Sequence, residues 1–235
     1  MTASSSSLKP RFFEDIATLK DAVMSEGELV KSRLSKAIDG LIQQNVDLLD
    51  EVAIGDADVN ACQIAIDDRA FKLLALHQPV AVDLRVIVAA IKINSDLERI
   101  GDLAVNISEA ARRYFGIADS IELKFLPRMA DIAQTMLDSA LQAFLSGSLG
   151  LAQSVLERDD ALDSLRVQAY RRLVDLMTSD SKLAPSALEL MAVARHLERI
   201  GDHATNIAED VFFIVAGEDV RMQTLGGADV GGVEQ

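Results

Sequence analysis

The sequence predicts an all-α protein made of two tandem antiparallel three-helix bundles, which are related by an internal pseudo-twofold duplication. Three observations support this fold class. Of the 235 residues, 49% are hydrophobic but only 4% are aromatic, which favours helices packed through aliphatic side chains. The segment LERIGDLAVNISE at 97–109 is followed one hundred positions later by LERIGDHATNIAE at 197–209. Prolines and turn residues also divide each half into three segments.

The duplication extends well beyond this signature. Segment 36–56 aligns without a gap on segment 139–159, and the alignment places Ile38 opposite Leu141. The other apolar positions of the two segments also coincide at helical spacing. We therefore expect both halves to adopt the same fold.

The prolines and turn residues predict where each helix begins and ends. Each half has one proline near the start of its first helix and one near the start of its third, namely Pro10, Pro79, Pro127 and Pro185. Proline is tolerated in the first turn of a helix and disfavoured inside one. The turn sequences QQN and SGS separate the first helix of each half from the second. The predicted helices are 11–43, 46–76, 80–115, 121–146, 149–179 and 185–216.

These helices define the expected domains. The first bundle covers 11–116 and the second covers 117–217, because short connections make successive helices antiparallel. The serine-rich segment 1–10 and the glycine-rich segment 218–235 are expected to be a disordered N-terminal tail and a flexible C-terminal tail. No apolar run is long enough to cross a bilayer, so we expect a cytoplasmic protein without membrane insertion.

Charge narrows the range of partners. Thirty-seven acidic residues against 23 basic ones give a formal net charge of −14. Such a surface repels a phosphate backbone, which argues against a nucleic-acid partner. It favours cations or a basic protein surface.

The signature places pairs of carboxylates on one side of a helix. Glu98 and Asp102 are four residues apart, and Glu198 and Asp202 repeat this spacing. At 100° per residue, both pairs continue an apolar stripe. A glycine precedes each aspartate, which leaves room either for a metal ion, the favoured explanation, or for close helix packing.

The second helix of each half offers matching polar pairs. These are Asp56 with Asn60 in the first half and Asp159 with Asp163 in the second. Oxygen ligands from two neighbouring helices suit cations such as Mg, Mn, Fe or Zn. Arg99 and Arg199 are alternative counter-charges, although each lies about 100° around the helix from the adjacent glutamate.

The motifs also disfavour enzymatic classes. A ferritin-like di-iron oxidase needs Glu-x-x-His, but glycine stands three residues after Glu98 and Glu198. The sequence contains no nucleophile elbow or glycine-rich phosphate loop. We therefore expect a protein that is not an enzyme.

The segments DLERIGDLAVNI and HLERIGDHATNIAE, together with IGDADVNACQIAID and HQPVAVDLR, resemble the PhoU family over about 11–217. The resemblance implies two three-helix bundles, a cytoplasmic location peripheral to membrane complexes, and negative regulation of the phosphate-starvation response and of phosphate uptake. The implied partners are the ATPase subunit of a phosphate ABC transporter, a sensor histidine kinase and a second copy in a homodimer.

The resemblance also implies divalent or trivalent metal ions, such as Fe, Zn, Mg or Mn, on the acidic helix motifs. The expected ligands are Glu98, Asp102, Asp56, Asn60, Glu198, Asp202, Asp159 and Asp163. Two departures matter here: Asn60 is not acidic, and Arg166 stands where the first half has Gln63, so it could neutralise the acids without a metal. The alternatives are a metal-dependent hydrolase or oxidase, and a dimeric scaffold whose acidic signature only sets helix packing.

Overall fold

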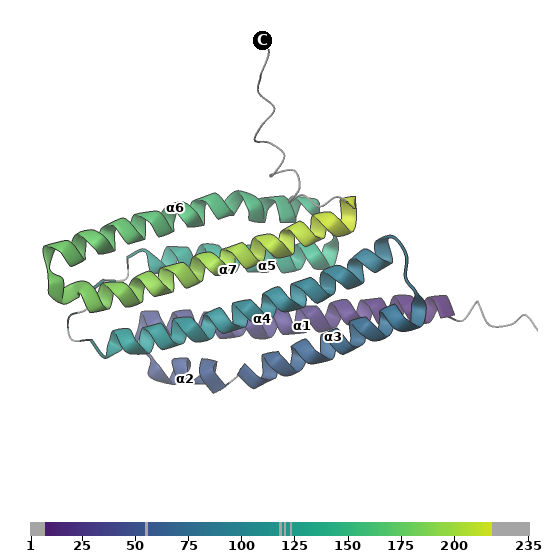
Figure 1. Ribbon diagram of the computed structural model, residues 1–235, viewed down its shortest axis with the longest axis horizontal. Coiled ribbons are helices and arrows are strands. Elements are labelled where there is room, and N and C mark those ends of the chain that lie inside the picture. The colour runs from purple at the N-terminus through teal and green to yellow at the C-terminus, as the bar shows by residue number, and fades with distance from the viewer. Residues whose placement is uncertain (1–7, 55, 118, 120, 123, 218–235) are drawn as a thin grey trace, which may run out of the picture.

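The chain folds into helices, as Figure 1 shows, which confirms the predicted all-α class. A computed structural model describes residues 8–54, 56–117, 119, 121–122 and 124–217, and these contain no strand. The helices are α1 (Leu8–Gln43), α2 (Val46–Ile54), α3 (Asp56–His77), α4 (Val82–Phe115), α5 (Leu126–Ser146), α6 (Leu149–Ser179), the short 3₁₀ helix η1 (Ser181–Leu183) and α7 (Ala184–Ala216).

The observed helix starts differ from the predicted ones by a few residues. Helix α1 begins at Leu8, inside the segment expected to be a disordered tail, whereas residues 1–7 and 218–235 of the two tails lie outside the described residues. Helix α5 begins at Leu126 rather than 121, with Pro127 in its first turn. Helix α7 begins in the same way with Pro185, because proline fits the first turn of a helix.

The second helix of the first half is described in two parts, and the predicted helix over 46–76 corresponds to α2 and α3 together. Helix α2 ends at Ile54 and α3 begins at Asp56, while α6 in the second half is continuous. Gly55, which lies outside the described residues, matches Arg158 of α6 in the duplication.

Side chains from α1 and α4 donate hydrogen bonds to carbonyls of α2. The buried Arg33 of α1 donates from Nη2 to the Val52 carbonyl at 3.0 Å, and Ser108 of α4 donates to the Leu49 carbonyl at 2.9 Å. Val52 lies in the last turn of α2, where a carbonyl is free to accept a hydrogen bond from outside the helix. In the second half, Met136 and Ala208 stand at the matching positions and cannot donate.

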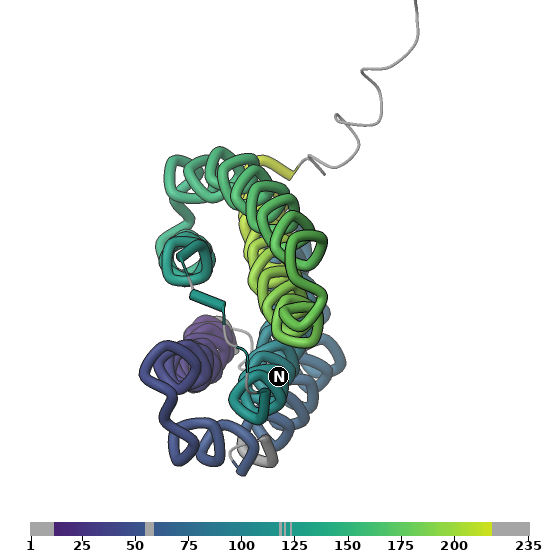
Figure 2. Tube along the Cα trace, turned by 90° about the vertical axis from the view of Figure 1, so that its left-hand side faces the viewer, coloured from purple at the N-terminus to yellow at the C-terminus, as the bar shows by residue number. Residues whose placement is uncertain are grey.

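The two halves form separate three-helix layers that pack on one another, as Figure 2 shows end-on. Helices α1 to α4 make the first bundle, and α5 to α7 make the second. Between the halves, α4 packs on α7 and α1 packs on α5. The first and third helices of each half thus meet their own counterparts, as a pseudo-twofold axis requires.

Polar contacts establish the direction of the packed helices. Along α4, Lys92 pairs with Asp210 at 2.8 Å, whereas Arg113, nearer the C-terminus, pairs with Glu189 at 3.0 Å. Residue numbers therefore fall along α7 as they rise along α4, so the two helices are antiparallel. Within the described ranges, no helix has the length and apolarity needed to cross a membrane.

Candidate functional site

The signature glycines face the interior of their own bundles. Both Gly101 on α4 and Gly201 on α7 are buried. A Cβ atom at Gly201 would lie 2.5 Å from Cδ2 of Leu162 and 3.5 Å from the terminal methyl of Met136. In the second bundle, the missing side chain therefore makes room for apolar neighbours on α6 and α5.

Gly101 has the corresponding neighbours in the first bundle. A Cβ atom there would lie 3.5 Å from Nη1 of Arg33 and 3.6 Å from Cγ1 of Val59. These residues match Met136 and Leu162 in the duplication, so the same positions surround both glycines. Close helix packing, the alternative explanation for the glycine, therefore holds at Gly201, while at Gly101 the neighbours lie at ordinary contact distances.

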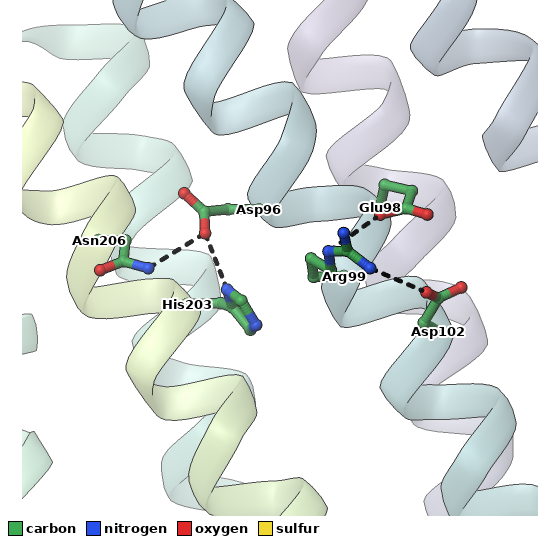
Figure 3. Close-up of polar contacts among 6 residues, drawn as sticks. All are labelled: Asp96, Glu98, Arg99, Asp102, His203 and Asn206. Carbon is green, nitrogen blue, oxygen red and sulfur yellow. Dashed lines mark hydrogen bonds and ion pairs between the residues drawn. The ribbon is translucent and has the colours of Figure 1, made fainter.

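In the first half, Arg99 reaches both signature carboxylates (Figure 3). Its Nε atom lies 3.6 Å from Glu98 Oε2, and its Nη1 atom lies 3.9 Å from Asp102 Oδ2. The expectation that helix geometry disfavours this arginine was wrong, because its long side chain folds back along the helix. The Arg99 side chain is 60% exposed, so these contacts are screened by solvent.

The partner pair on α3 is only partly described. Asn60 is exposed, and the side chain of Asp56 lies outside the described residues. The structure therefore shows Glu98 and Asp102 sharing one counter-charge, but it does not show how Asp56 completes the predicted set.

In the second half, four acidic residues lie close enough to affect one another. Burial raises the pKa of Asp159, and the charges of Asp202 and Asp163 raise it further. The pKa of Asp202 is raised by burial and then by Asp163, although nearby cations oppose this shift. Burial raises the pKa of Glu198, with a further contribution from Asp202. Like charges that oppose ionisation in this way indicate a site that would favour a cation.

Arg166 of α6 supplies part of that positive charge. Its Nε atom lies 3.1 Å from Glu198 Oε1 and 3.9 Å from Asp163 Oδ1. The contact with Glu198 is close in distance but is not an aligned hydrogen bond, because this buried Nε has no hydrogen-bond acceptor. Arg166 thus partly neutralises the second-half acids, as the sequence suggested it could.

The carboxylates do not form a finished coordination shell. No three His, Cys, Asp or Glu side chains of the described part of the chain are arranged to hold a metal ion. The mutual pKa effects indicate that these acids are neighbours.

A buried acid in the first half was missed from the sequence. Glu26 of α1 is fully buried, and neither carboxylate oxygen has a hydrogen-bond partner. Burial, followed by the charges of Asp67 and Glu98, raises its pKa to about 8. Asn94 lies close by and donates from Nδ2 to Asp67 at 2.9 Å. The sequence did contain a signal for this residue. The duplication aligns Glu26 with the apolar Met129, so an acid stands at a position that is a core position in the other half.

The contact between the halves uses a second set of polar residues (Figure 3). Asp96 of α4 lies 2.8 Å from Nδ1 of His203 and accepts a hydrogen bond from Nδ2 of Asn206 at 3.1 Å. Both partners belong to α7. Asn206 therefore points away from the second-half carboxylates, although the signature places it on the same side of the helix as an amide neighbour.

Comparison with known proteins places these features in context. A family model described as PhoU domain matches residues 23–111 and 126–211, one match in each half. The phosphate-specific transport system accessory protein PhoU of Edwardsiella tarda is 37% identical over 220 residues, which cover 94% of this chain and 90% of that protein. The accessory protein PhoU of Escherichia coli K12 is 34% identical over 211 residues, which cover 90% of this chain and 88% of that protein. Because the relatives are named accessory proteins, the prediction of a non-enzymatic chain is confirmed.

Solved structures match to a similar extent. The crystal structure of PhoU from Pseudomonas aeruginosa has a TM-score of 0.85 at 33% identity and covers 88% of this chain and 100% of its own. The phosphate transport system regulatory protein PhoU from Streptococcus pneumoniae has a TM-score of 0.83 at 26% identity and covers 88% and 98%. These likenesses confirm the tandem helical architecture.

Proposed function

The chain belongs to the PhoU family, and from this premise we propose that it is an accessory regulator of a phosphate-specific transport system. The observation that carries the proposal is the match to both halves, together with relatives of that name that align over about nine-tenths of the chain. A regulator of this kind acts by binding other proteins. Its long, rigid helices offer extended faces for that purpose.

We further propose that the protein acts in the cytoplasm, on the ATPase subunit of the transporter and on a sensor histidine kinase. It would restrain phosphate uptake and keep the phosphate-starvation response off when phosphate is plentiful. The formal net charge of −14 supports partners with basic docking surfaces, because opposite fields steer association.

Deleting the gene in the source organism tests this proposal. Under phosphate-rich conditions, we expect higher expression of a phosphate-responsive reporter and faster phosphate uptake, and both should be reversed by a plasmid copy. Recovery of the ATPase subunit and the kinase with the tagged chain from membrane extracts would support direct contact. Unchanged reporter expression and uptake after deletion would contradict the regulatory role.

We also propose that the acidic motifs bind a metal ion with a regulatory or structural role. In the second half, Glu198, Asp202, Asp159 and Asp163 would supply the ligands, and their raised pKa values support a demand for positive charge. In the first half, the ligands would be Glu98, Asp102, Asp56 and Asn60. Carboxylate and amide oxygens suit Mg, Mn, Fe or Zn without strong selection among them.

Arg166 provides a test with an internal reference, because Gln63 stands at the matching position. We expect Arg166→Gln to increase Mn²⁺ affinity by about tenfold, since removing a cation from a carboxylate cluster strengthens the field on an incoming ion. Titration calorimetry with Mn²⁺ measures this change. Combining Asp102→Ala with Asp202→Ala should abolish binding while leaving the circular dichroism spectrum unchanged. Equal metal content in wild type and the double variant would favour an acidic signature that only sets packing.

A further inference from the structure

Helix α5 is short compared with its counterpart in the first bundle. It has 21 residues, whereas α1 has 36. The first residue of α5, Leu126, matches Val23 in the duplication. The part of α1 that precedes Val23 therefore has no helical counterpart in the second bundle. Figure 1 shows the consequence, because α6 and α7 extend together past the start of α5.

A cavity lies at this end of the second bundle. Its volume is about 250 Å³, and it is bounded by α6, α7 and described residues at the start of α5 and just before it. The apolar wall on α6 and α7 matches buried residues of α3 and α4, as Ala169, Leu173, Leu176 and Leu190 match Ile66, Ala70, Leu73 and Ala90. In the first bundle, α1 packs on α3 and α4. The second bundle thus keeps an apolar wall for a helical segment that α5 does not supply.

The first bundle shows what such a wall accommodates. In the part of α1 that precedes Val23, Ile16 and Leu19 are buried, and their spacing places them on one side of the helix. Arg69 of α3 donates from Nη1 to the Thr18 carbonyl of the same segment at 3.3 Å.

Arg172 of α6 stands at the position that matches Arg69. Arg172 lines the cavity, and it forms no hydrogen bond or ion pair with the described part of the chain. The second bundle therefore has the arginine but lacks the helical segment that the first bundle offers to its arginine.

The size of the cavity and the charge at its rim indicate what it binds. Small-molecule sites usually measure about 300–1,000 Å³, so this cavity is better suited to a few apolar side chains. At the rim, Lys124 pairs with Glu122 at 3.0 Å, while Arg172 is left without an acidic partner among the described residues. An incoming acid would complement that charge.

We propose that this end of the second bundle binds an amphipathic helix of another protein. The helix would place two apolar side chains, three residues apart, in the cavity and acidic side chains beside Arg172. Apolar anchors at helical spacing are the usual way in which a helix binds a groove. This inference goes beyond the proposed function, because the site and the chemistry of its partner do not depend on a role in phosphate regulation.

The first turns of α1 provide a probe with the required pattern. A labelled peptide of residues 12–22, capped at both ends, contains Ile16 and Leu19 and has three acids against one lysine. Fluorescence anisotropy with the full chain should show saturable binding of one peptide per chain. A peptide with Leu19→Asp should not bind, because it loses one of the two apolar anchors.

Variants of the chain locate the site. Arg172→Glu should weaken binding of the peptide by at least about fivefold. Arg171→Glu makes the same change of charge at an exposed neighbour outside the cavity, so it should leave binding unchanged. Ala169→Ile introduces the residue found at the matching position of the first bundle. It should fill part of the cavity and weaken binding without lowering Tm.

Three results would overturn the inference. The first is a wild-type chain that does not bind the peptide, or that binds it no better than the Arg172→Glu and Ala169→Ile variants do. The second is binding of decanoate without binding of the peptide, which would assign the cavity to an acyl chain. The third is a particle mass that falls when the peptide is added, which would assign the cavity to a second copy of the chain.

Discussion

Single side chains account for most of the difference between the two halves. Glu26, Asp67 and Asn94 make a polar group inside the first bundle. The duplication replaces them with Met129, Tyr170 and Ala194, so the second bundle has no carboxylate at these positions and its one hydroxyl, on Tyr170, donates to the Met191 carbonyl at 3.1 Å. Burying a polar group without a partner costs free energy. The first bundle is therefore less stable than it would be with the residues that the second bundle has at these positions. A cost of this kind is expected where a protein retains a site for function.

Glu26 gives a direct test of that cost. Its pKa is about 8 in the folded chain and 4.5 in the unfolded chain. Between these values the unfolded state releases the proton first, so the free energy of unfolding falls as pH rises. Glu26→Gln removes this loss, and we expect it to stabilise the chain at pH 8 by on the order of 1–3 kcal/mol.

Urea unfolding in the presence of a chelator, at pH 4.5 and pH 8, measures the effect. Glu14→Gln, on the exposed part of α1, is the matched control and should change little at either pH. Equal stability of wild type and Glu26→Gln at pH 8 would mean that the buried carboxylate has a partner after all.

His196 should give the opposite pH dependence. It is buried, and its Nδ1 atom has no hydrogen-bond partner. Burial, followed by the charges of Arg195 and Arg199, lowers its pKa from 6.5 to about 4. The unfolded state therefore gains a proton first as pH falls from 6.5 to 4, and stability is lost across that window. Over the same pH range, the free energy of unfolding of His196→Gln should fall by on the order of 1–3 kcal/mol less than that of the wild type. Parallel urea-unfolding profiles against pH would refute this origin of acid sensitivity.

At the scale of helices, local signals predicted most boundaries. Proline and the periodicity of apolar residues act within one helix, so they locate α4, α5 and α7 to within a few residues. The hydrogen bonds that hold α2 come from distant helices, namely from Arg33 and Ser108, and no signal within α2 predicts them.

The candidate site was predictable to a similar degree. Spacing placed Glu98 and Asp102 on one side of α4, where both are found close to one counter-charge. The choice of that counter-charge depends on side-chain rotamers, which helical angles do not determine. Whether Gly201 opens a gap or closes a packing contact depends on Leu162, a residue of another helix.

Ser108 should hold α2 in place. Its hydroxyl donates to the buried Leu49 carbonyl, and Ala208 stands at the matching position beside the unbroken α6. We expect Ser108→Ala to destabilise the chain by about 1 kcal/mol and to speed amide exchange in α2 more than in α6. Hydrogen exchange followed by mass spectrometry resolves the two helices. Equal acceleration in both helices would indicate a global effect instead.

At the scale of the whole molecule, the two bundles share one extended interface. Helices α4 and α7 bury aliphatic side chains along their length, including Ile100 and Ile200 of the signature. The pseudo-twofold relation makes the packing of α4 on α7 nearly symmetric, but the charged residues of this interface are not arranged symmetrically. The pair of Lys92 with the buried Asp210 occurs once, and the duplication places Ala192 and Ala110 at the equivalent positions. The ion pair therefore occurs on one side of the pseudo-twofold axis only, and it helps to specify how the two halves pack.

A double-mutant cycle on this pair tests how the halves are joined. Lys92→Ala and Asp210→Ala should each destabilise the chain, because each removes one side of a partly buried ion pair. The double variant should lose less free energy of unfolding than the sum of the losses in the two single variants. We expect this difference, the coupling energy of the pair, to be on the order of 1 kcal/mol. Because α4 and α7 belong to different bundles but form one core, we expect amide protection in α3 and α6 to be lost at the same urea concentration in every variant. Additive single effects, or loss of protection in α6 at a urea concentration that leaves α3 protected, would show that the bundles unfold as independent units joined by a weak contact.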